Sequence, residues 1–167
     1  MNSPSSARLW TGIDSTHYES KAQYRAAILE QYKLYVEMAD RMSQRRGLAN
    51  TFFLTLNTAL LAAAGATGTL MNAPLWQLSF ALLGVLAQSA VWFYLLRSYR
   101  QLSAAKYQVI GWLEEQLPSS PYWRAEWDLL GAGKDRGLFL RLTDVEKWIP
   151  VIFAVAYAGV FVAIAVG

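Results

Sequence analysis

The chain has 167 residues, of which 54% are hydrophobic and 16% are charged, and its formal net charge at pH 7 is +3. It contains no cysteine and one histidine, which excludes disulfides, thiolate chemistry and a zinc site built from these residue types. The weak positive charge does not indicate nucleic-acid binding, because the fifteen basic residues are interleaved with twelve acidic ones and lie beside apolar segments. We therefore expect no cofactor, no metal and no nucleic-acid partner.

The N-terminal third is predicted to hold a tail and one long helix. Residues 1–17 form a serine-rich mobile tail, and the single histidine, His17, lies at its edge as a solvated side chain. Residues 18–50 lack proline, and their apolar side chains recur at steps of three and four residues: Tyr24, Ile28, Tyr32, Tyr35, Met38 or Ala39, and Met42. This spacing predicts a cytoplasmic amphipathic helix that continues into the next segment.

Residues 51–96 lie in the most informative segment, an uncharged run from Gly47 to Leu96. A bilayer core of ~30 Å needs ~20 apolar residues for each helical crossing, so the run is long enough for two crossings. Asn72 and Pro74 indicate a turn in its middle. We predict a transmembrane hairpin with spans at about 51–70 and 75–96.

Two uncharged polar side chains lie within these spans, Asn57 in the first and Gln88 in the second. An unpaired amide is costly in lipid, so both side chains should point at protein. In an antiparallel hairpin they fall at similar depth, and the simplest arrangement is a hydrogen bond between them, within or between subunits. The alternative is that they line a polar pathway.

The first span also carries a stripe of small or hydroxylated residues at steps of three and four, which are Thr51, Thr55, Thr58, Ala62, Gly65 and Thr69. Such a stripe lets helices approach closely in lipid, and the third span offers small residues at similar spacing: Ala154, Ala158, Gly159 and Ala163. Helix packing is one interpretation, and the lining of a pore is the other. Both require neighbours, so we expect a homo-oligomer.

Residues 97–147 are predicted to form a cytoplasmic helical region. A helix over 97–117 pairs with the helix of residues 18–50, and the prolines of 118–121 end it. A short helix over 122–130 and a glycine-rich loop over 131–137 follow.

Two features of this region suggest chemistry, and both are rejected. The run from Gly131 to Lys134 lacks the spacing of a phosphate-binding loop, because one residue rather than four separates its first glycine from the Gly-Lys pair. The second feature is a possible acid and base pair among the carboxylates of this region, which are Glu114, Glu115, Glu126 and Asp128. Adjacent residues on a helix do not face one another, and a charged run is usually solvated, so we reject this pair as well. We predict that the protein is not an enzyme.

Residues 148–167 predict a third transmembrane helix, preceded by a capping box of Thr143 and Glu146. Tryptophans near span ends are predicted as interfacial anchors, because indole rings favour the headgroup layer: Trp76, Trp92 and Trp148. Trp123 and Trp127 either pack beneath the cytoplasmic helices or lie as anchors in the headgroup layer.

The distribution of Lys and Arg sets the orientation. Seven precede the first span and eight lie within 97–147, whereas none lies in the 71–74 turn or after the third span. By the positive-inside rule, the N-terminus and 97–147 are cytoplasmic and the C-terminus faces outward. The predicted fold class is therefore an all-α, multi-pass integral membrane protein with three transmembrane helices, long cytoplasmic helical extensions and a homo-oligomeric assembly.

Distinctive motifs lie along most of the chain, at Tyr32 to Arg41, Ser43, Arg45-Arg46, Asn50, Phe52-Phe53, Leu56-Asn57, Trp112 to Leu117, Pro121-Tyr122, Glu126-Trp127, Leu142-Thr143 and Glu146 to Pro150. Together they resemble the RipA family of octameric bacterial membrane proteins, roughly over residues 24–155. The resemblance implies a homo-octamer in the bacterial inner membrane, without an assigned catalytic reaction. It also implies an association with growth inside host cells, as in some members. We therefore expect a role in envelope homeostasis or host adaptation.

Two main classes of function follow. The first is a non-enzymatic scaffold whose cytoplasmic helices form a ring that engages membrane lipid or an unidentified cytoplasmic protein. The second is a channel or transport unit with the first span lining an axial pathway. The absence of charged residues within the spans argues against proton coupling and voltage sensing. An enzyme acting on lipid at the inner surface is a third class, which no set of catalytic residues supports.

Overall fold

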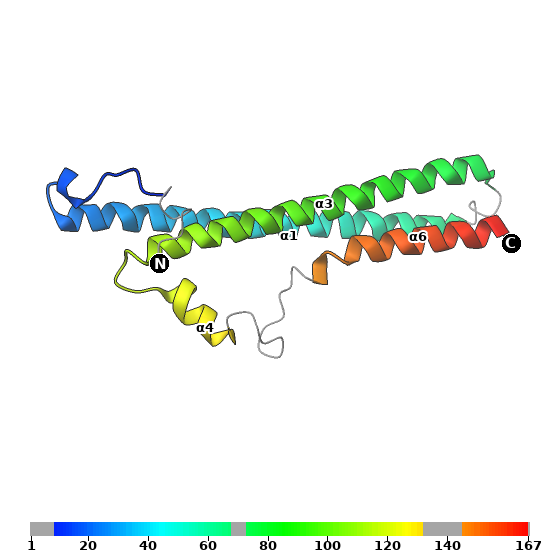
Figure 1. Cartoon of the computed structure of the whole chain (residues 1–167). Helices are drawn as coiled ribbons and strands as arrows, with labels where there is room; N and C mark the ends of the chain where they lie inside the picture. Colours follow the sequence, from blue (N-terminus) through cyan, green and yellow to red (C-terminus); the bar gives the residue numbers. More distant parts are fainter. Residues whose placement is uncertain (1–8, 68–72, 132–144, 167) are drawn as a thin grey trace. The chain divides into compact units, whose positions relative to one another are not determined.

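The computed structural model describes residues 9–67, 73–131 and 145–166, and all regular structure within these ranges is helical. The elements in chain order are η2 (Ser15–His17), α1 (Lys21–Thr67), α3 (Leu75–Glu114), a π-helix η3 (Pro121–Glu126), α4 (Trp127–Leu129) and α6 (Ile149–Val166) (Figure 1).

Helix α1 is one continuous helix over residues of both the predicted amphipathic segment and the first predicted span. Ion pairs at helical spacing support its charged part: Lys33 Nζ lies 2.8 Å from Glu30 Oε1, and Arg41 Nη2 lies 2.6 Å from Glu37 Oε1. Gly47 lies between the charged and apolar parts. A Cβ at this glycine would meet nothing within 4 Å, so packing does not require a glycine there.

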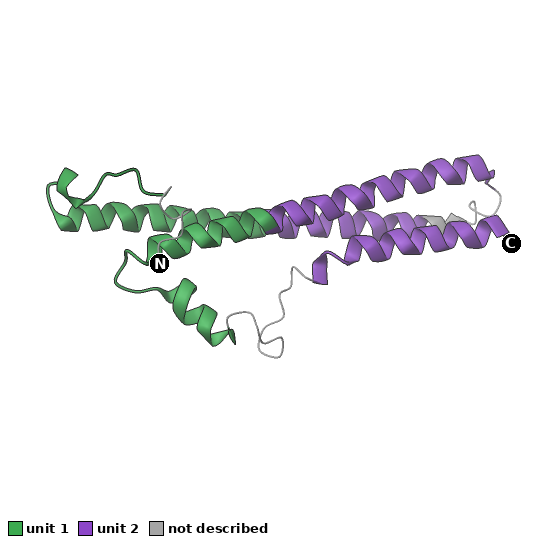
Figure 2. Cartoon of the chain, viewed as in Figure 1, with its two compact units in different colours: residues 1–44, 101–140 green, residues 45–100, 141–167 purple. Residues whose placement is uncertain are grey.

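The chain divides into two compact units (Figure 2). Unit 1 comprises residues 1–44 and 101–140, and unit 2 comprises residues 45–100 and 141–167. Each of the two long helices, α1 and α3, therefore contributes one part to each unit.

Unit 1 has a small apolar core. Ile28 and Ala39 of α1 are buried there, as are Ile110 and Leu113 of α3. The two α1 residues belong to the apolar stripe that predicted an amphipathic helix, so this stripe forms the packed face.

Unit 2 has a core of mixed character. Leu78, Trp92 and Leu96 of α3 are buried, and Asn57 of α1 is buried with them. Pro150 of α6 is buried as well; it lies at the second position of its helix, where a missing N–H group removes no intrahelical hydrogen bond.

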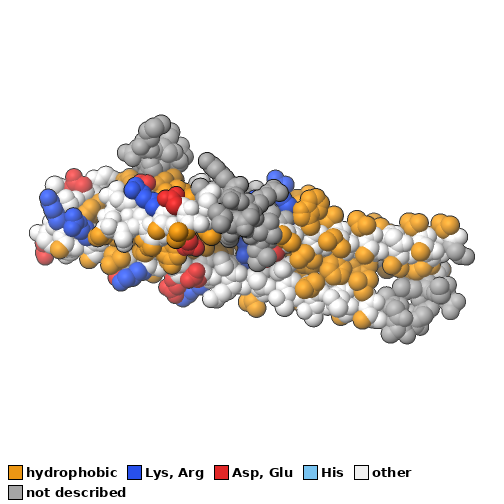
Figure 3. Space-filling model, turned by 90° about the horizontal axis from the view of Figure 1, so that it is seen from below, with side chains coloured by type: hydrophobic (Ala, Val, Ile, Leu, Met, Phe, Trp, Pro, Cys, Tyr) orange, Lys and Arg blue, Asp and Glu red, His pale blue; other side chains and the backbone are white. Residues whose placement is uncertain are grey.

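Two of the described helices, α3 and α6, are long and apolar enough to cross a membrane. The most apolar 18-residue segments of α3 and α6 have mean hydropathies of 1.7 and 2.5, yet only 17% and 6% of these segments is buried within the chain. Apolar helices that stay exposed are typical of membrane spans and not of soluble cores. Figure 3 shows one face on which the described hydrophobic side chains gather over a long stretch without charged neighbours.

The first predicted span, 51–70, lies in α1 up to Thr67, and its last three residues lie outside the described part of the chain. The arrangement with three spans therefore stays a prediction. The capping residue Thr143 and the loop from residue 132 onward also lie outside the described ranges.

The segment after α3 differs from the predicted boundaries. Helix α3 ends at Glu114, before the predicted end at Leu117, and η3 and α4 occupy the place of the predicted short helix over 122–130. Pro121 is the first residue of η3, where its fixed backbone angle favours helix initiation.

Candidate functional site

The centre of unit 2 is the indole of Trp92, which is fully buried. Its ring stacks on Phe53 of α1 at 5.5 Å between centroids and lies 6.0 Å from Phe153 of α6. Its Nε1–H donates to Asn50 Oδ1 over 3.2 Å. The prediction that Trp92 is an interfacial anchor is therefore wrong. Aromatic rings and an amide of the same chain, and not lipid headgroups, surround both its apolar and its polar edge.

Asn57 has both ends of its amide satisfied by protein. Its Nδ2 donates to the Phe53 carbonyl one turn earlier over 2.8 Å. Tyr157 of α6 donates its hydroxyl to Asn57 Oδ1 over 3.0 Å, and the same hydroxyl lies 3.2 Å from the Asn57 carbonyl oxygen. The prediction that this side chain points at protein is confirmed. These bonds tie α1 to α6 inside an apolar unit, where an unpaired amide would be costly.

Gln88 is not the partner of Asn57 within the chain. Its Nε2 is buried and has no hydrogen-bond partner among the described residues. The bond predicted between the two amides, within or between subunits, is therefore not made within the chain, where Asn57 is bonded to Phe53 and Tyr157 instead. Sequence reasoning missed Tyr157 as a partner of Asn57, because no pattern within the first two spans indicates which residue of the third span reaches this acceptor.

The stripe on α1 is not used for packing within the chain. Its members whose side chains are described, Thr51, Thr55, Thr58 and Ala62, are all exposed. The hydroxyl of Thr58 donates to the Leu54 carbonyl over 2.8 Å, so its donor is already satisfied. The side chains of Gly65 and Thr69 lie outside the described part. The exposed stripe is thus open to a neighbouring molecule.

A shallow groove of about 450 Å³ runs between α3 and α6 in unit 2. Its walls are apolar or small, and they include Leu86, Ala90 and Tyr94 of α3 and Val151, Ala154 and Ala158 of α6. Short side chains on α6 hollow the surface between the two helices.

Charged residues lie at one end of unit 2. Arg46 Nε is 3.7 Å from Glu146 Oε2, and both side chains are mostly buried. Lys147 Nζ lies 5.9 Å from the ring centroid of Trp148, which is exposed. Trp76, at the start of α3, is also exposed. The exposure of Trp76 and Trp148 is compatible with the predicted anchoring role, which stays a prediction.

Glu114 organises unit 1. It is fully buried, and each of its carboxylate oxygens accepts two hydrogen bonds. Oε1 accepts from the Tyr32 hydroxyl at 2.9 Å and the Tyr122 N–H at 3.2 Å. Oε2 accepts from the Ser120 hydroxyl at 2.7 Å and the Trp123 N–H at 2.9 Å. The carboxylate therefore caps the first turn of η3 and joins it to α1.

The prediction that Glu114 belongs to a solvated charged run is therefore wrong, whereas its neighbour Glu115 is exposed. A signal was present in the sequence, since Pro121 marks a helix start whose free N–H groups need an acceptor. Burial and the hydrogen bond to Glu114 raise the pKa of Tyr32 above its ordinary value.

Trp123 packs closely against α3 at Gly111. A Cβ built on Gly111 would lie 2.7 Å from Cε3 of the indole, a distance that side chains do not tolerate. One face of Trp123 thus packs on α3, as the first of the two alternatives for the Trp pair predicted. Trp123 and Trp127 are also partly exposed, and their contact with lipid headgroups stays a prediction.

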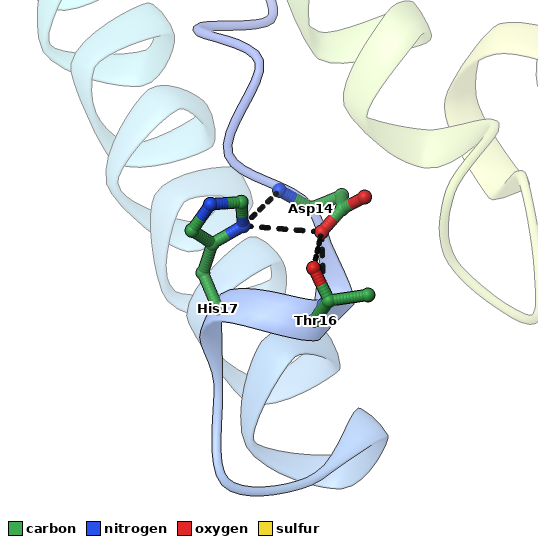
Figure 4. A network of polar contacts seen from close by, with 3 residues as sticks. All are labelled: Asp14, Thr16 and His17. Atoms are coloured by element: carbon green, nitrogen blue, oxygen red, sulfur yellow. Dashed lines mark hydrogen bonds and ion pairs between the residues drawn. The ribbon is translucent and has the colours of Figure 1, made fainter.

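A small polar network lies at the start of unit 1 (Figure 4). Asp14 Oδ1 accepts hydrogen bonds from the Thr16 hydroxyl at 2.5 Å and the Thr16 N–H at 2.9 Å, and His17 Nδ1 lies 3.1 Å from it. These contacts cap η2. They also lower the pKa of Asp14: the hydrogen bond from the Thr16 hydroxyl has the largest effect, and the bonds with the Thr16 N–H and His17 add to it. His17 therefore has a local structural role.

A model of the octameric membrane protein family (8xMP) matches residues 29–166. This agrees with the family resemblance drawn from the sequence motifs. No curated protein and no solved structure matches the chain.

Proposed function

The chain belongs to the octameric membrane protein family and is an oligomeric membrane protein, and from this premise we propose that it is a non-enzymatic scaffold of the bacterial inner membrane. In this proposal, three spans per subunit assemble into a homo-octamer whose cytoplasmic helices present a ring of docking faces. The scaffold would support envelope homeostasis or adaptation to a host.

The exposed α1 stripe is the observation that carries the proposal. Thr51, Thr55, Thr58 and Ala62 are small, lie on one face and contact no other described helix closely enough to be buried. In lipid, close contact between small residues is a main source of helix association. A neighbouring subunit would bury this face.

The polar groups inside unit 2 support the same proposal. The hydrogen bonds of Asn57, Tyr157, Asn50 and Trp92 are made within the chain. A pathway for ions or polar solutes needs polar groups that face an open space. In unit 2 these groups hold the helices together instead.

A channel is the second candidate, and the hydroxyl-bearing side chains of the exposed stripe favour it. If α1 faced the axis of a ring, Thr51, Thr55 and Thr58 would line the path. Their oxygens could accept hydrogen bonds from water even where the hydroxyl proton is bonded to the preceding turn.

One pair of substitutions on α1 separates the candidates. Under the scaffold proposal, Ala62→Leu reduces the subunit number measured by native mass spectrometry, because overpacking costs ~1–3 kcal/mol in each subunit. Ala81→Leu, at an exposed small residue of α3, is the matched control and keeps the assembly intact. An intact oligomer whose ion flux in liposomes responds to both Ala62→Leu and Thr58→Asp would favour the channel.

The orientation is tested separately with reporter fusions at Met1, Gly133 and Gly167. The excess of Lys and Arg around the predicted cytoplasmic segments requires the first two fusions to report the cytoplasm and the third to report the outside. A fusion at Gly133 that reports the outside would contradict the proposed topology.

A further inference from the structure

Unit 1 has an exposed apolar surface where α1 and α3 meet. Leu34 and Met38 of α1 and Leu102 of α3 are each about half exposed. They surround a contact between the two helices, in which Lys106 Nζ lies 5.5 Å from the ring centroid of Tyr35. Leu102 is four residues before Lys106, and Met38 is three residues after Tyr35, so helical spacing places them on the side of this contact. We call Leu34, Met38, Leu102 and Lys106 the α1–α3 patch.

A second exposed surface lies on the segment that follows α3. Tyr122 is about half exposed, Leu129 is 80% exposed, and Glu126 between them is exposed as well. Steps of four and three residues align these side chains along one side of η3 and α4. Another side of the segment is held against α3, where Trp123 packs at Gly111. We call Tyr122, Glu126 and Leu129 the η3–α4 patch.

The two patches lie on opposite sides of α3. Leu102 belongs to the first patch, and Gly111 is the point where the segment of the second patch packs. These two residues are nine positions apart, which is about two and a half helical turns, so they face opposite directions. One copy of the chain therefore presents the two patches to two different neighbours.

The patches are also complementary in charge. Lys106 is the basic residue of the α1–α3 patch, and Glu126 is the acidic residue of the η3–α4 patch. Neither forms an ion pair with another side chain in the part of the chain that the structure describes. Two further charged residues near Met38, which are Glu37 and Arg41, neutralise each other at 2.6 Å. Docking of the patches would bring Lys106 to Glu126 between apolar contacts.

We propose that the η3–α4 patch of one copy docks on the α1–α3 patch of the next copy. The inference rests on the proposed ring of copies and names one of its contacts. Copies inserted in one membrane share one orientation, so a closed ring repeats a single contact between two different surfaces of each copy. The two patches are such a pair, and Met38 offers its sulfur to an aromatic ring such as that of Tyr122. This contact belongs to unit 1, whereas the α1 stripe belongs to unit 2.

A second copy fits the η3–α4 patch better than a membrane surface does. Glu126 and Asp128 are exposed acidic residues of this segment, and Arg124 is the basic residue among 121–129. Anionic headgroups repel the net negative charge of these three side chains. Lys106 of the next copy attracts it.

Cross-linking tests the contact directly, because the chain has no cysteine of its own. The double variant Met38→Cys/Leu129→Cys is treated in its membrane with a short bismaleimide, since a disulfide would require Cα atoms within ~7 Å. A head-to-tail contact links each copy to the next. Denaturing gels should therefore show a ladder whose longest member has the subunit number that native mass spectrometry finds for the parent protein.

The double variant Leu29→Cys/Leu129→Cys is the matched control. Leu29 is also an exposed leucine of α1, but it lies nine residues before Met38 and so on the opposite side of the helix. This variant should give no ladder.

A charge exchange tests the pairing of the patches. In the background of the Met38→Cys/Leu129→Cys variant, Lys106→Glu should lower the yield of linked chains about two- to fivefold, as expected for an exposed ion pair. Adding Glu126→Lys should restore the yield. If Glu126→Lys lowers the yield further instead, the two residues do not meet and the proposed docking is wrong.

The other outcomes are equally decisive. A ladder of equal strength in the Leu29→Cys control, or linkage confined to single chains, would overturn the contact. Linkage of Leu129→Cys to a phospholipid with a maleimide headgroup, in place of the ladder, would assign the segment to the membrane surface and overturn it too. A monomeric parent protein would refute the ring and this contact together. An intact oligomer without the ladder would refute the contact and leave the proposed scaffold standing.

Discussion

The hydroxyl of Tyr157 lies 3.0 Å from Oδ1 of Asn57, although 100 residues separate the two along the chain. This contact joins the last helix of unit 2 to the first, at a level where the surrounding side chains are apolar. Since Asn57 is fully buried, the tyrosine satisfies an acceptor that neither water nor lipid could reach.

Replacing the tyrosine tests this contact. Tyr157→Phe keeps the ring and removes the donor, so we expect a loss of ~0.6–1.7 kcal/mol in the free energy of unfolding, the range of such bonds in membrane proteins. Unfolding in mixed detergent and SDS micelles measures the difference. Tyr94→Phe, at an exposed tyrosine of the same unit, should cost much less. Equal losses in the two variants would contradict the assigned bond.

The general character of unit 2 could be predicted from sequence because it depends on local patterns. An uncharged run of apolar residues indicates membrane helices wherever they pack, and the membrane family is confirmed. The partners of Trp92 and Asn57 could not be predicted in this way. They depend on how three helices rotate about their axes, which local periodicity leaves undetermined.

A second prediction concerns Glu114. In Glu114→Gln, the new NH₂ group replaces an oxygen that accepts two donors, one of which is a backbone N–H. The hydroxyl of Tyr32 or Ser120 can rotate to accept a hydrogen bond from the new group, whereas the backbone N–H of Tyr122 or Trp123 cannot and loses its acceptor. An unsatisfied buried donor costs ~1–3 kcal/mol, so hydrogen exchange of these amides should accelerate ~5- to 150-fold.

Glu115→Gln is the matched control, because it makes the same chemical change at the next residue, which is exposed. Exchange in η3 should stay unchanged in this variant. If both substitutions accelerate exchange equally, the four hydrogen bonds of Glu114 do not hold the start of η3.

The third prediction concerns alkaline pH. Burial and the bond to Glu114 raise the pKa of Tyr32 from its ordinary value of 10.0, so the folded protein retains a proton that the unfolded chain loses. The contribution of Tyr32 is fully present below about pH 10 and falls as pH rises towards the raised pKa. Unfolding temperatures between pH 8 and pH 11 should therefore decline less in Tyr32→Phe than in the parent protein.

Other groups that titrate over this pH range also change the stability, but they are present in the parent protein and in both variants and therefore do not account for a difference between them. Tyr107→Phe, at an exposed tyrosine of α3, provides the comparison. Its unfolding temperature should decline with pH as steeply as that of the parent. A parallel decline in Tyr32→Phe would show that Tyr32 does not carry the effect.

The Glu114 cluster was only partly predictable: Pro121 indicates N–H groups that need an acceptor, but the sequence does not indicate which residue accepts them. Sequence spacing treats a glutamate as solvated unless a pattern indicates a partner. The partners here come from α1 and from residues 120–123, on either side of Pro121. The apolar stripe containing Ile28 was predictable because one helix suffices to define it. The hydrogen-bond partners of a buried charge, in contrast, come from separate segments and are known only once the fold is known.

The last prediction concerns Gly111, where α3 and Trp123 approach most closely. In Gly111→Ala, the added methyl group overlaps the indole, so Trp123 must move away from α3. Overpacking costs ~1–3 kcal/mol, and because the overlap here is severe we expect a cost in the upper part of this range, above the ~1 kcal/mol that alanine gains over glycine in a helix. Gly84→Ala on the same helix meets nothing within 4 Å and should stabilise the protein instead.

Opposite shifts of the unfolding temperature in the two variants, with faster hydrogen exchange in η3 for Gly111→Ala alone, would support the contact between Gly111 and Trp123. A stabilised Gly111→Ala protein would show that Trp123 does not pack there.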